Sequence, residues 1–460
     1  MIRPQLKQAK SLSVAFKFLP RGIAVEPFKG GKYQLTYPKA VYDKFPLAGR
    51  RWLAENFTYA RTRPLTLFKE NLSYPFPAPA LRKFVDWGIV KDLPCIADLN
   101  GLSVSKIMAD FKLAGRQISF ANLAPAKLPP LNSLANRAVL ALSFGKDSLL
   151  SYGLTKELGL NYRLVCGNEM ETAMGGEWKI KSQIIKKFCA QEKEKVWLFS
   201  DNIDELFYHR RFKVHLTEAD DTNSMLAYAM EMLPFVYWHQ ARYLIVGNER
   251  NLNDFFIGRE GYQVYPAYDQ SAAYTQAENK YWSKLTDNRF QVISLLEPLY
   301  NVAEMKILYS RYRHLLQYLM SCAPAKGSNE RWCYKCPMCA KAFLYSCAVG
   351  GNPKQISFNR NFFDKKYSEF YPMFAKNKLR HYERPPQVKE EQLLSFLLCY
   401  RQGLKGDLID LFKKRYLTEA LRKEKSFRKR YFGVHAPVNL PIFLRGGVLG
   451  IYRQELKDLT

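Results

Sequence analysis

The chain has 460 residues, with 70 Lys and Arg against 42 Asp and Glu and a formal net charge of +28. Its 47% hydrophobic and 14% aromatic content excludes a disordered or low-complexity protein, and its length predicts two or three domains. No apolar run reaches the roughly 18 residues of a membrane span. Lys7, Lys10 and Lys17 interrupt the weakly apolar N-terminus, so no secretory signal is predicted. We expect a soluble, cytoplasmic protein without a membrane span.

The positive charge is concentrated in the two ends of the sequence. Residues 1–100 hold 17 basic and 7 acidic residues, and residues 351–460 hold 23 and 11. Such an excess is typical of nucleic-acid binding, but it is equally typical of a solvated surface. The densest cluster, Arg422–Arg430, is compatible with a phosphate-binding face or an exposed helix end.

Residues 1–130 are predicted to form an α+β region, because many prolines interrupt long helices and Gly31–Tyr37 has the pattern of a strand. The segment Ala124–Pro130 has the composition of a linker. Nothing in this region indicates a particular chemistry.

From about residue 136 the pattern becomes regular. The predicted strands are Arg137–Ser143, Tyr162–Cys166, Lys195–Ser200, Ala241–Gly247 and Gln291–Leu295. The predicted helices between them are Asp147–Leu158, Trp178–Cys189 and Met225–Gln240. Strands that alternate with helices indicate an α/β fold, here a doubly wound, mostly parallel sheet within residues 131–350.

Polar residues follow four of these strands. In a doubly wound sheet, ligands bind beyond the carboxyl ends of the strands. The segments that we expect at this edge are Ser143–Ser148, Asn168-Glu169, Asp201-Asn202 and Asn248-Glu249. The pattern therefore predicts a binding site there.

Beyond the sheet the sequence becomes helical. An amphipathic helix is predicted over 302–320 and a second over 339–349. Residues 351–460 are predicted to be a basic helical region, with helices at 390–400 and 408–425.

The sharpest local motif is Ser143-Phe144-Gly145-Lys146-Asp147-Ser148, where a strand turns into a helix. Backbone N–H groups at a helix start bind phosphate oxygens. Gly145 allows close approach, Lys146 adds a positive charge, and Ser143 and Ser148 add hydroxyl donors. The spacing is not that of a Walker loop.

This motif resembles the loop of the PP-loop ATP pyrophosphatases, Ser-Gly-Gly-x-Asp-Ser, with Phe144 at the first glycine. These enzymes cleave ATP between its α and β phosphates and transfer AMP to a carboxylate or carbonyl oxygen. The resemblance implies that Ser143, Gly145, Lys146, Asp147 and Ser148 bind the pyrophosphate part of ATP. It also implies Mg²⁺ as a cofactor, with Asp147 as a direct or water-mediated ligand.

A second motif consists of cysteines, Cys322-x10-Cys333-x2-Cys336-x2-Cys339. Four thiolates form a closed tetrahedral zinc site, which is a structural arrangement. Cys347 is an alternative fourth ligand in the zinc segment 322–347, and an iron–sulfur cluster is the alternative to zinc.

A PP-loop domain followed by such cysteines resembles the cyano-deazaguanine synthase group, which is about half as long as this chain. The family of ATP-dependent UDP-N-acetylmuramoyl-L-alanyl-L-glutamate epimerases is similar in length, loop, Cys-rich segment and the segments Val246–Glu249 and Tyr268–Ser271. That resemblance implies an isomerase of peptidoglycan synthesis, with a role in cell wall biogenesis and cell shape. Its substrate is a UDP-linked muropeptide.

The alternatives are a deazaguanine-type amide or nitrile synthase, a PP-loop tRNA-modifying enzyme, and a non-enzymatic zinc module that contacts RNA. Nucleic acid is not favoured as a partner, since the basic residues lie in the flanks.

An epimerase needs a base with a pKa near neutrality. The carboxylate candidates are Glu169, Asp201 and Glu249, and the histidine candidates are His209, His215 and His239. Two further segments, Asp220–Ser224 and Tyr268–Ser271, are candidates for substrate contact. The first is equally well explained as a helix cap formed by Thr222 or Asn223. Arg250 and Arg259 are candidates for binding the substrate diphosphate.

Overall fold

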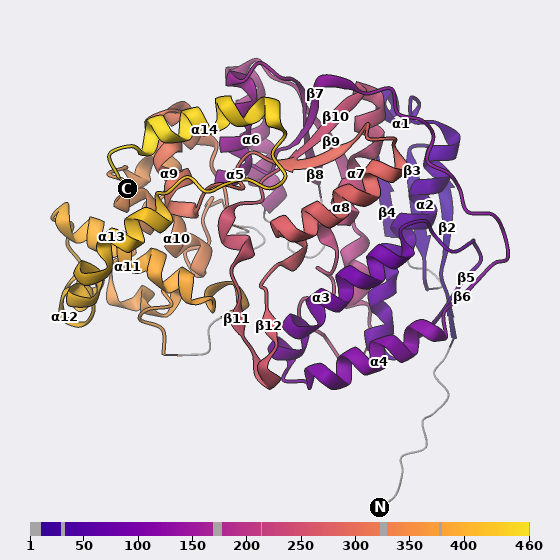
Figure 1. Cartoon of the computed structure of the whole chain (residues 1–460), viewed down its shortest axis with the longest axis horizontal. Helices are drawn as coiled ribbons and strands as arrows, with labels where there is room; N and C mark the ends of the chain where they lie inside the picture. The colour runs from indigo at the N-terminus through magenta and orange to yellow at the C-terminus, as the bar shows by residue number, and fades with distance from the viewer. Residues whose placement is uncertain are drawn as a thin grey trace, which may run out of the picture.

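An eight-stranded sheet forms the centre of the protein (Figure 1). The computed structural model describes residues 11–28, 33–168, 177–212, 214–322, 329–376 and 380–459. In spatial order the strands are β13 (Gln291–Ser294), β10 (Ala241–Val246), β7 (Leu134–Ala141), β8 (Asn161–Asn168), β9 (Val196–Asp201), β4 (Tyr33–Thr36), β3 (Gly22–Glu26) and β2 (Ala15–Leu19).

The five strands from β13 to β9 are parallel. The first of them in the chain, β7, lies in the middle; β8 and β9 follow on one side of it, and β10 and β13 lie on the other. The order in which the strands are added therefore reverses between β7 and β10. This is the topological switch point, where doubly wound sheets bind ligands. The predicted α/β class with parallel strands is confirmed, while the PP-loop fold stays a prediction.

Helices cover both faces of this sheet because successive strand residues point to opposite sides. On β7, Ala138 and Leu140 pack on the side of the helices that follow β7, β8 and β13, whereas Val139 packs on the opposite side. The helices on the side of Ala138 and Leu140 are α5 (Lys146–Glu157), α6 (Glu177–Glu192) and α9 (Asn301–Ser310). The helices on the side of Val139 are α1 (Lys39–Tyr42), α2 (Leu47–Thr62), α7 (Ser224–His239) and α8 (Ala272–Leu285).

The N-terminal strands extend the same sheet. β2, β3 and β4 form an antiparallel meander, and β4 pairs with β9 through Leu35 opposite Asp201 and Thr36 opposite Ser200. The strand predicted near residues 31–37 is β4, although residues 31 and 32 lie outside the described residues. A boundary near residue 130 stays a prediction, while the sheet itself contains strands from both sides of it. The remaining N-terminal elements are α3 (Arg82–Asn100), α4 (Val104–Arg116) and a small sheet of β1 (Ser11–Ser13), β5 (Asn71–Tyr74) and β6 (Ser119–Phe120).

The C-terminal helices pack beyond α9, at the opposite end of the molecule from β2–β4 (Figure 1). They are α10 (Pro337–Ala348), α11 (Pro386–Arg401), α12 (Asp407–Arg415), α13 (Leu417–Tyr431) and α14 (Ile442–Leu456). A short hairpin of β11 (Phe256–Ile257) and β12 (Gln263–Val264) lies between the C-terminal helices and the N-terminal helices α3 and α4. Among the described residues, no helix combines the length and the apolar character that crossing a bilayer demands.

Two predicted helices are shorter than expected. The helix predicted over 302–320 ends at Ser310, since Arg311 binds Glu157 and the Tyr312 ring packs against Gly153 of α5. The helix predicted over 408–425 is divided at Tyr416, whose hydroxyl donates a 2.6 Å hydrogen bond to the carbonyl oxygen of Met373. In both places a tertiary contact outweighs the helical pattern.

Candidate functional site

The loop Ser143–Ser148 connects β7 to α5 at the switch point of the sheet. Phe144 has a positive φ of 66°, a conformation that glycine adopts at little cost. Its buried ring packs edge-to-face on Phe188, with ring centroids 5.3 Å apart. Burial of this ring offsets the conformational cost, which explains how phenylalanine occupies a position where the PP-loop pattern has glycine.

Gly145 precedes the first turn of α5 with φ −68° and ψ 165°, values open to any residue. A Cβ atom at this position would meet nothing closer than the Ser143 Oγ, at 3.5 Å. The protein's own packing therefore does not require glycine here. The backbone amides of Gly145 and Lys146 donate long hydrogen bonds, 3.5 and 3.4 Å, to the hydroxyls of Ser143 and Ser321. Weakly held amides at a helix start are available to an anion.

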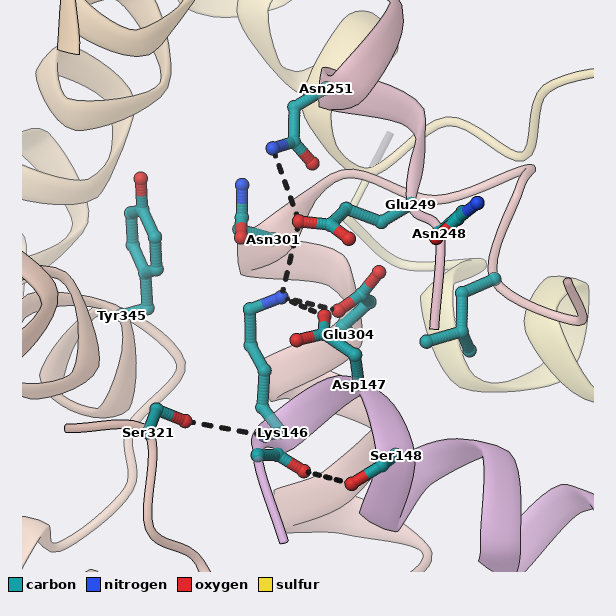
Figure 2. Close-up of polar contacts among 12 residues, drawn as sticks. Lys146, Asp147, Ser148, Asn248, Glu249, Asn251, Asn301, Glu304, Ser321 and Tyr345 are labelled. Atoms are coloured by element: carbon teal, nitrogen blue, oxygen red, sulfur yellow. Dashed lines mark hydrogen bonds and ion pairs between the residues drawn. The ribbon is translucent and has the colours of Figure 1, made fainter. Parts of the chain in front are cut away.

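Lys146 lies among three carboxylates that come from three elements (Figure 2). Its Nζ is 2.7 Å from Glu304 Oε2 and 3.8 Å from Glu249 Oε1, and it forms an ion pair with Asp147. One oxygen from each carboxylate lies within 4.8 Å of the others. The side chain of Glu304 has no exposed surface, and that of Lys146 is 13% exposed.

Burial shifts the pKa values in this group. Burial, together with the charge of Asp147, raises the pKa of Glu249 to about 7 against the opposing effect of Lys146. Burial also raises the pKa of Glu304 well above its usual value, again against the effect of Lys146. Burial alone disfavours the charged form of Lys146, but the neighbouring carboxylates outweigh this and raise its pKa. The group is therefore strongly coupled by charge.

Two residues of this site, Glu304 and Glu391, were not predicted from the sequence, whereas Gly247 lies in the segment Val246–Glu249 that carries the family resemblance. Gly247, directly after β10, lies against α5, and a Cβ atom there would be 2.8 Å from the Cβ of Asp147. Glu304 is a lone carboxylate in the apolar first turn of α9. Because a carboxylate is costly to bury, this pattern could have marked Glu304 as a candidate site residue. Glu391 of α11 accepts a 2.9 Å hydrogen bond from the backbone amide of Val302 and a 3.1 Å hydrogen bond from the Tyr345 hydroxyl, so it supports the start of α9.

The three carboxylates predicted as bases do not lie together. Glu249 lies beside the loop, whereas Glu169 lies outside the described residues. Asp201 is buried on the other face of the sheet, where it accepts a 2.8 Å hydrogen bond from the Ile203 amide. Side chains two apart on a strand share a face, and Phe199 packs in the core beside α7. Asp201 is therefore not part of the Lys146 group.

The histidine candidates also lie away from the loop. His239 Nε2 is 3.0 Å from the carbonyl oxygen of Asn161, at the amino end of β8. His209 stacks on Phe28, and His215 stacks on Tyr208. These contacts place all three histidines away from the Lys146 group.

The segments 220–224 and 268–271 meet each other. The carboxylate of Asp269 accepts hydrogen bonds from the Ser224 hydroxyl at 2.8 Å and the Met225 amide at 2.9 Å, so Asp269 caps α7. Thr222 and Asn223, the predicted caps, do not supply this bond: the Asn223 side chain donates to the Val85 carbonyl oxygen. Both segments line a cavity of about 90 Å³.

The two candidate arginines lie apart. Arg250 directly follows Glu249, and Arg259 lies in the turn between β11 and β12. His435 links Arg250 to Arg430 of the basic C-terminal cluster: its Nε2 is 2.8 Å from the carbonyl oxygen of Arg430, and its amide donates to the Pro298 carbonyl oxygen at 3.1 Å. The Arg250 amide donates to the carbonyl oxygen of the next residue, Leu299, at 2.7 Å.

The four predicted cysteines Cys322, Cys333, Cys336 and Cys339 converge. Four of their Sγ–Sγ distances are 3.8, 3.7, 3.6 and 3.7 Å. A tetrahedral ion with Zn–S bonds of about 2.3 Å requires separations of about 3.8 Å. An iron–sulfur cluster would hold the thiolates farther apart, because each binds a different iron. Cys347 is buried elsewhere on α10 and is not part of the group. The four thiolates are therefore compatible with a structural zinc ion.

The cysteine group is joined to the Ser143–Ser148 loop. The backbone amide of Met320 donates to the carbonyl oxygen of Phe144 at 2.8 Å, and the next residue, Ser321, accepts from the Lys146 amide. Cys322 follows directly. Searches with this chain found no matching protein-family model and no matching curated protein.

Proposed function

We propose that this protein is an ATP-dependent enzyme that adenylates a carboxylate, and that it converts the terminal L-Glu of UDP-N-acetylmuramoyl-L-alanyl-L-glutamate to D-Glu. The observation that carries the proposal is the Ser143–Ser148 loop at the switch point, with Lys146 and three carboxylates beside a helix start. This position and this combination of groups suit a nucleoside triphosphate with its divalent cation.

The loop has distinct groups for the phosphates. The amides of Gly145 and Lys146 and the hydroxyls of Ser143 and Ser148 are hydrogen-bond donors, and the start of α5 favours negative charge. The absence of a side chain at Gly145 leaves the amides accessible. Mg²⁺, when bound, would neutralise the phosphate charge, and Asp147, Glu249 and Glu304 have the oxygen ligands that it prefers. Zinc would take a structural role only.

The chemistry requires two stages. A carboxylate oxygen of the terminal glutamate attacks the α-phosphorus of ATP, the bond to the β-phosphate oxygen breaks, and pyrophosphate leaves. The resulting acyl-adenylate withdraws electron density from Cα, so a base can remove the Cα proton. A proton returns from the other face, and water then cleaves the acyl–phosphate bond to release AMP and the D-glutamyl product.

The choice of substrate is supported by the resemblance to the epimerase family in length, loop and cysteine segment. Arg250, which directly follows Glu249, also suits an anionic substrate, because a UDP group brings two phosphates. Arg430 belongs to the basic C-terminal cluster, and its guanidinium also pairs with Glu390 at 3.2 Å.

The test is a direct assay of the purified full-length protein with ATP, Mg²⁺ and UDP-N-acetylmuramoyl-L-alanyl-L-glutamate. We expect AMP, pyrophosphate and, after acid hydrolysis, D-glutamate; in D₂O the product should carry deuterium at Cα. Lys146→Met should abolish AMP formation, while Lys156→Met, a lysine change on the same helix, should preserve it. Failure to form both AMP and D-glutamate would contradict the proposal. AMP formation only with a carboxy-deazaguanine and ammonia, or only with tRNA, would favour the corresponding alternative.

A further inference from the structure

A cavity of about 330 Å³ lies between α3, α4 and Arg63, the residue that directly follows α2. Figure 1 shows α3 and α4 next to each other, away from the C-terminal helices. α3 contributes Asp86 and Val90, which are one helical turn apart, and α4 contributes Met108 and the residues three, four and seven positions after it. These spacings place the lining residues on one face of each helix. The volume is at the lower end of the range for small-ligand pockets.

The cavity is lined by a buried positive charge. Arg63 is only 1% exposed, and its guanidinium carbon lies 3.7 Å from the centre of the Phe111 ring. Its Nε donates a 2.7 Å hydrogen bond to Asp86 Oδ1, and the same oxygen accepts a 2.9 Å hydrogen bond from the Tyr59 hydroxyl. The guanidinium is therefore held in a fixed position, and the carboxylate oxygen that pairs with it is shared with a second donor.

The outer edge of this guanidinium is only weakly engaged. Nη2 donates to the carbonyl oxygen of Phe111 over a long distance of 3.4 Å. A Cβ atom at Gly115 would be 2.9 Å from Nη2, so the absence of a side chain there makes room for the guanidinium. Arg63 and Gly115 both line the cavity. Because Nη2 carries two N–H groups, it can also donate to an acceptor inside the cavity.

The remaining walls are apolar, with a second positive charge beside them. Val90, Met108 and Phe111 supply hydrocarbon and aromatic surface, and Val90 is 37% exposed at the opening. Lys112, which is exposed, adds an ammonium group. Arg63 and Lys112 face one carboxylate, that of Asp86, so one positive charge is unmatched. Such a cavity suits a ligand that has an apolar body and one negative charge.

We propose that this cavity binds a small monocarboxylate with an apolar body, such as a medium-chain fatty acid, whose carboxylate lies beside Arg63 and whose hydrocarbon packs on Met108 and Phe111. A planar guanidinium matches the geometry of a carboxylate, and hydrogen bonds between ionised groups are the strong ones. The Lys146 group comes from α5, α9 and the segment after β10, so this site is separate from it. The proposal goes beyond the ATP-dependent chemistry and does not depend on it.

The experiment is calorimetric titration of the full-length protein with octanoate, and with 1-octanol and octylammonium as probes of the same chain length. We expect saturable binding of one octanoate per chain and at least about tenfold weaker binding of both other probes, which lack the negative charge. Val90→Glu places a carboxylate at the opening and should weaken octanoate binding at least about tenfold. Leu113→Glu is the matched control, because Leu113 is 57% exposed on α4 and does not line the cavity. Its octanoate affinity should equal that of the wild type.

Arg63→Met should also remove octanoate binding. If this buried change prevents folding, Val90→Glu still tests the site, since position 90 is partly exposed. Equal affinity for octanoate and 1-octanol would overturn the proposal, because the positive charge would then play no part. Octanoate binding that is unchanged in Val90→Glu would place the ligand elsewhere and would overturn it as well, as would the lack of saturable binding to the wild type.

Discussion

The backbone amide of Met320 donates a 2.8 Å hydrogen bond to the carbonyl oxygen of Phe144. This bond joins the segment that leads into the cysteine group to the loop at the start of α5. Ser321 reinforces the connection by accepting from the Lys146 amide. An ion that fixes Cys322 therefore also holds the neighbouring Met320 and Ser321 against the loop.

Loss of the Cys322 thiolate should impair the loop as well as the metal site. Cys322→Ser leaves three thiolates, so we expect loss of most of the zinc and at least about tenfold weaker binding of an ATP analogue. Cys347→Ser is the matched control, because Cys347 lies outside the group. Zinc is measured by elemental analysis and nucleotide binding by calorimetry. Equal zinc loss in both variants would contradict the assignment of the four ligands.

Gly145→Ala separates ligand binding from folding. A Cβ atom at Gly145 meets protein atoms only at ordinary contact distances. The free energy of unfolding should therefore change by less than about 1 kcal/mol. The methyl group would stand over the loop amides, so affinity for an ATP analogue should fall at least about tenfold. Gly446→Ala, within α14 and open to solvent, is the control. An unchanged affinity in Gly145→Ala would argue against phosphate binding at these amides.

Gly247→Ala should damage the site through packing. The added methyl group would lie 2.8 Å from the Cβ of Asp147, so α5 or the end of β10 must shift. We expect a loss of about 1–3 kcal/mol in the free energy of unfolding, measured by denaturant unfolding, together with weaker binding of an ATP analogue. Gly450→Ala, which meets no atom within 4 Å, should have neither effect. Full stability in Gly247→Ala would show that this close approach is absent in solution.

Lys146 and Glu304 should show strong energetic coupling. Lys146→Met removes the cation from three buried or partly buried carboxylates, so we expect a loss of about 3 kcal/mol in the free energy of unfolding. Adding Glu304→Gln removes one of the unpaired charges and should recover part of this loss. Urea unfolding of the wild type, both single variants and the double variant gives the coupling energy. Additive effects would mean that the 2.7 Å contact contributes nothing.

Glu278 should make stability depend on pH. Burial raises its pKa to about 8, even though Trp282 Nε1 donates a 2.8 Å hydrogen bond to its carboxyl oxygen. The folded state thus holds a proton that the unfolded state releases near its ordinary pKa of about 4.3. The stabilisation by protonated Glu278 is fully present below a pH of about 4.3 and is lost as the pH rises through about 8. We expect the loss to amount to about 2–4 kcal/mol in the free energy of unfolding. Glu278→Gln keeps the acceptor and should flatten the fall between pH 5 and pH 9 in urea unfolding. An equally steep fall in Glu278→Gln would show that another group is responsible.

The elements around the candidate site could be predicted well because their sequence signals are local. The strand that ends before Ser143, the helix that follows and the spacing of Cys333, Cys336 and Cys339 each occupy a short stretch. The parallel strands and the position of Glu249 at their carboxyl edge follow from the alternation of strands with helices.

The partners that come from distant parts of the chain could not be predicted. Glu304 and Glu391 reach the site only through the packing of α9 and α11; the apolar turn around Glu304 marks this carboxylate as unusual but does not say what it contacts. Asp201 was expected at the same edge as Glu249, but the face on which it lies depends on strand register. The break at Tyr416 depends likewise on a partner 43 residues away, Met373.

The antiparallel pairing of β4 with β9 also affects how the protein can be divided. A fragment that begins after residue 130 would lose β2, β3 and β4 and leave β9 as an open edge, with the backbone groups of Ser200 and Asp201 unpaired. Open edges pair readily with other chains, so such a fragment should aggregate even with its cysteine group and loop intact. The N-terminal strands thus protect the sheet from intermolecular association.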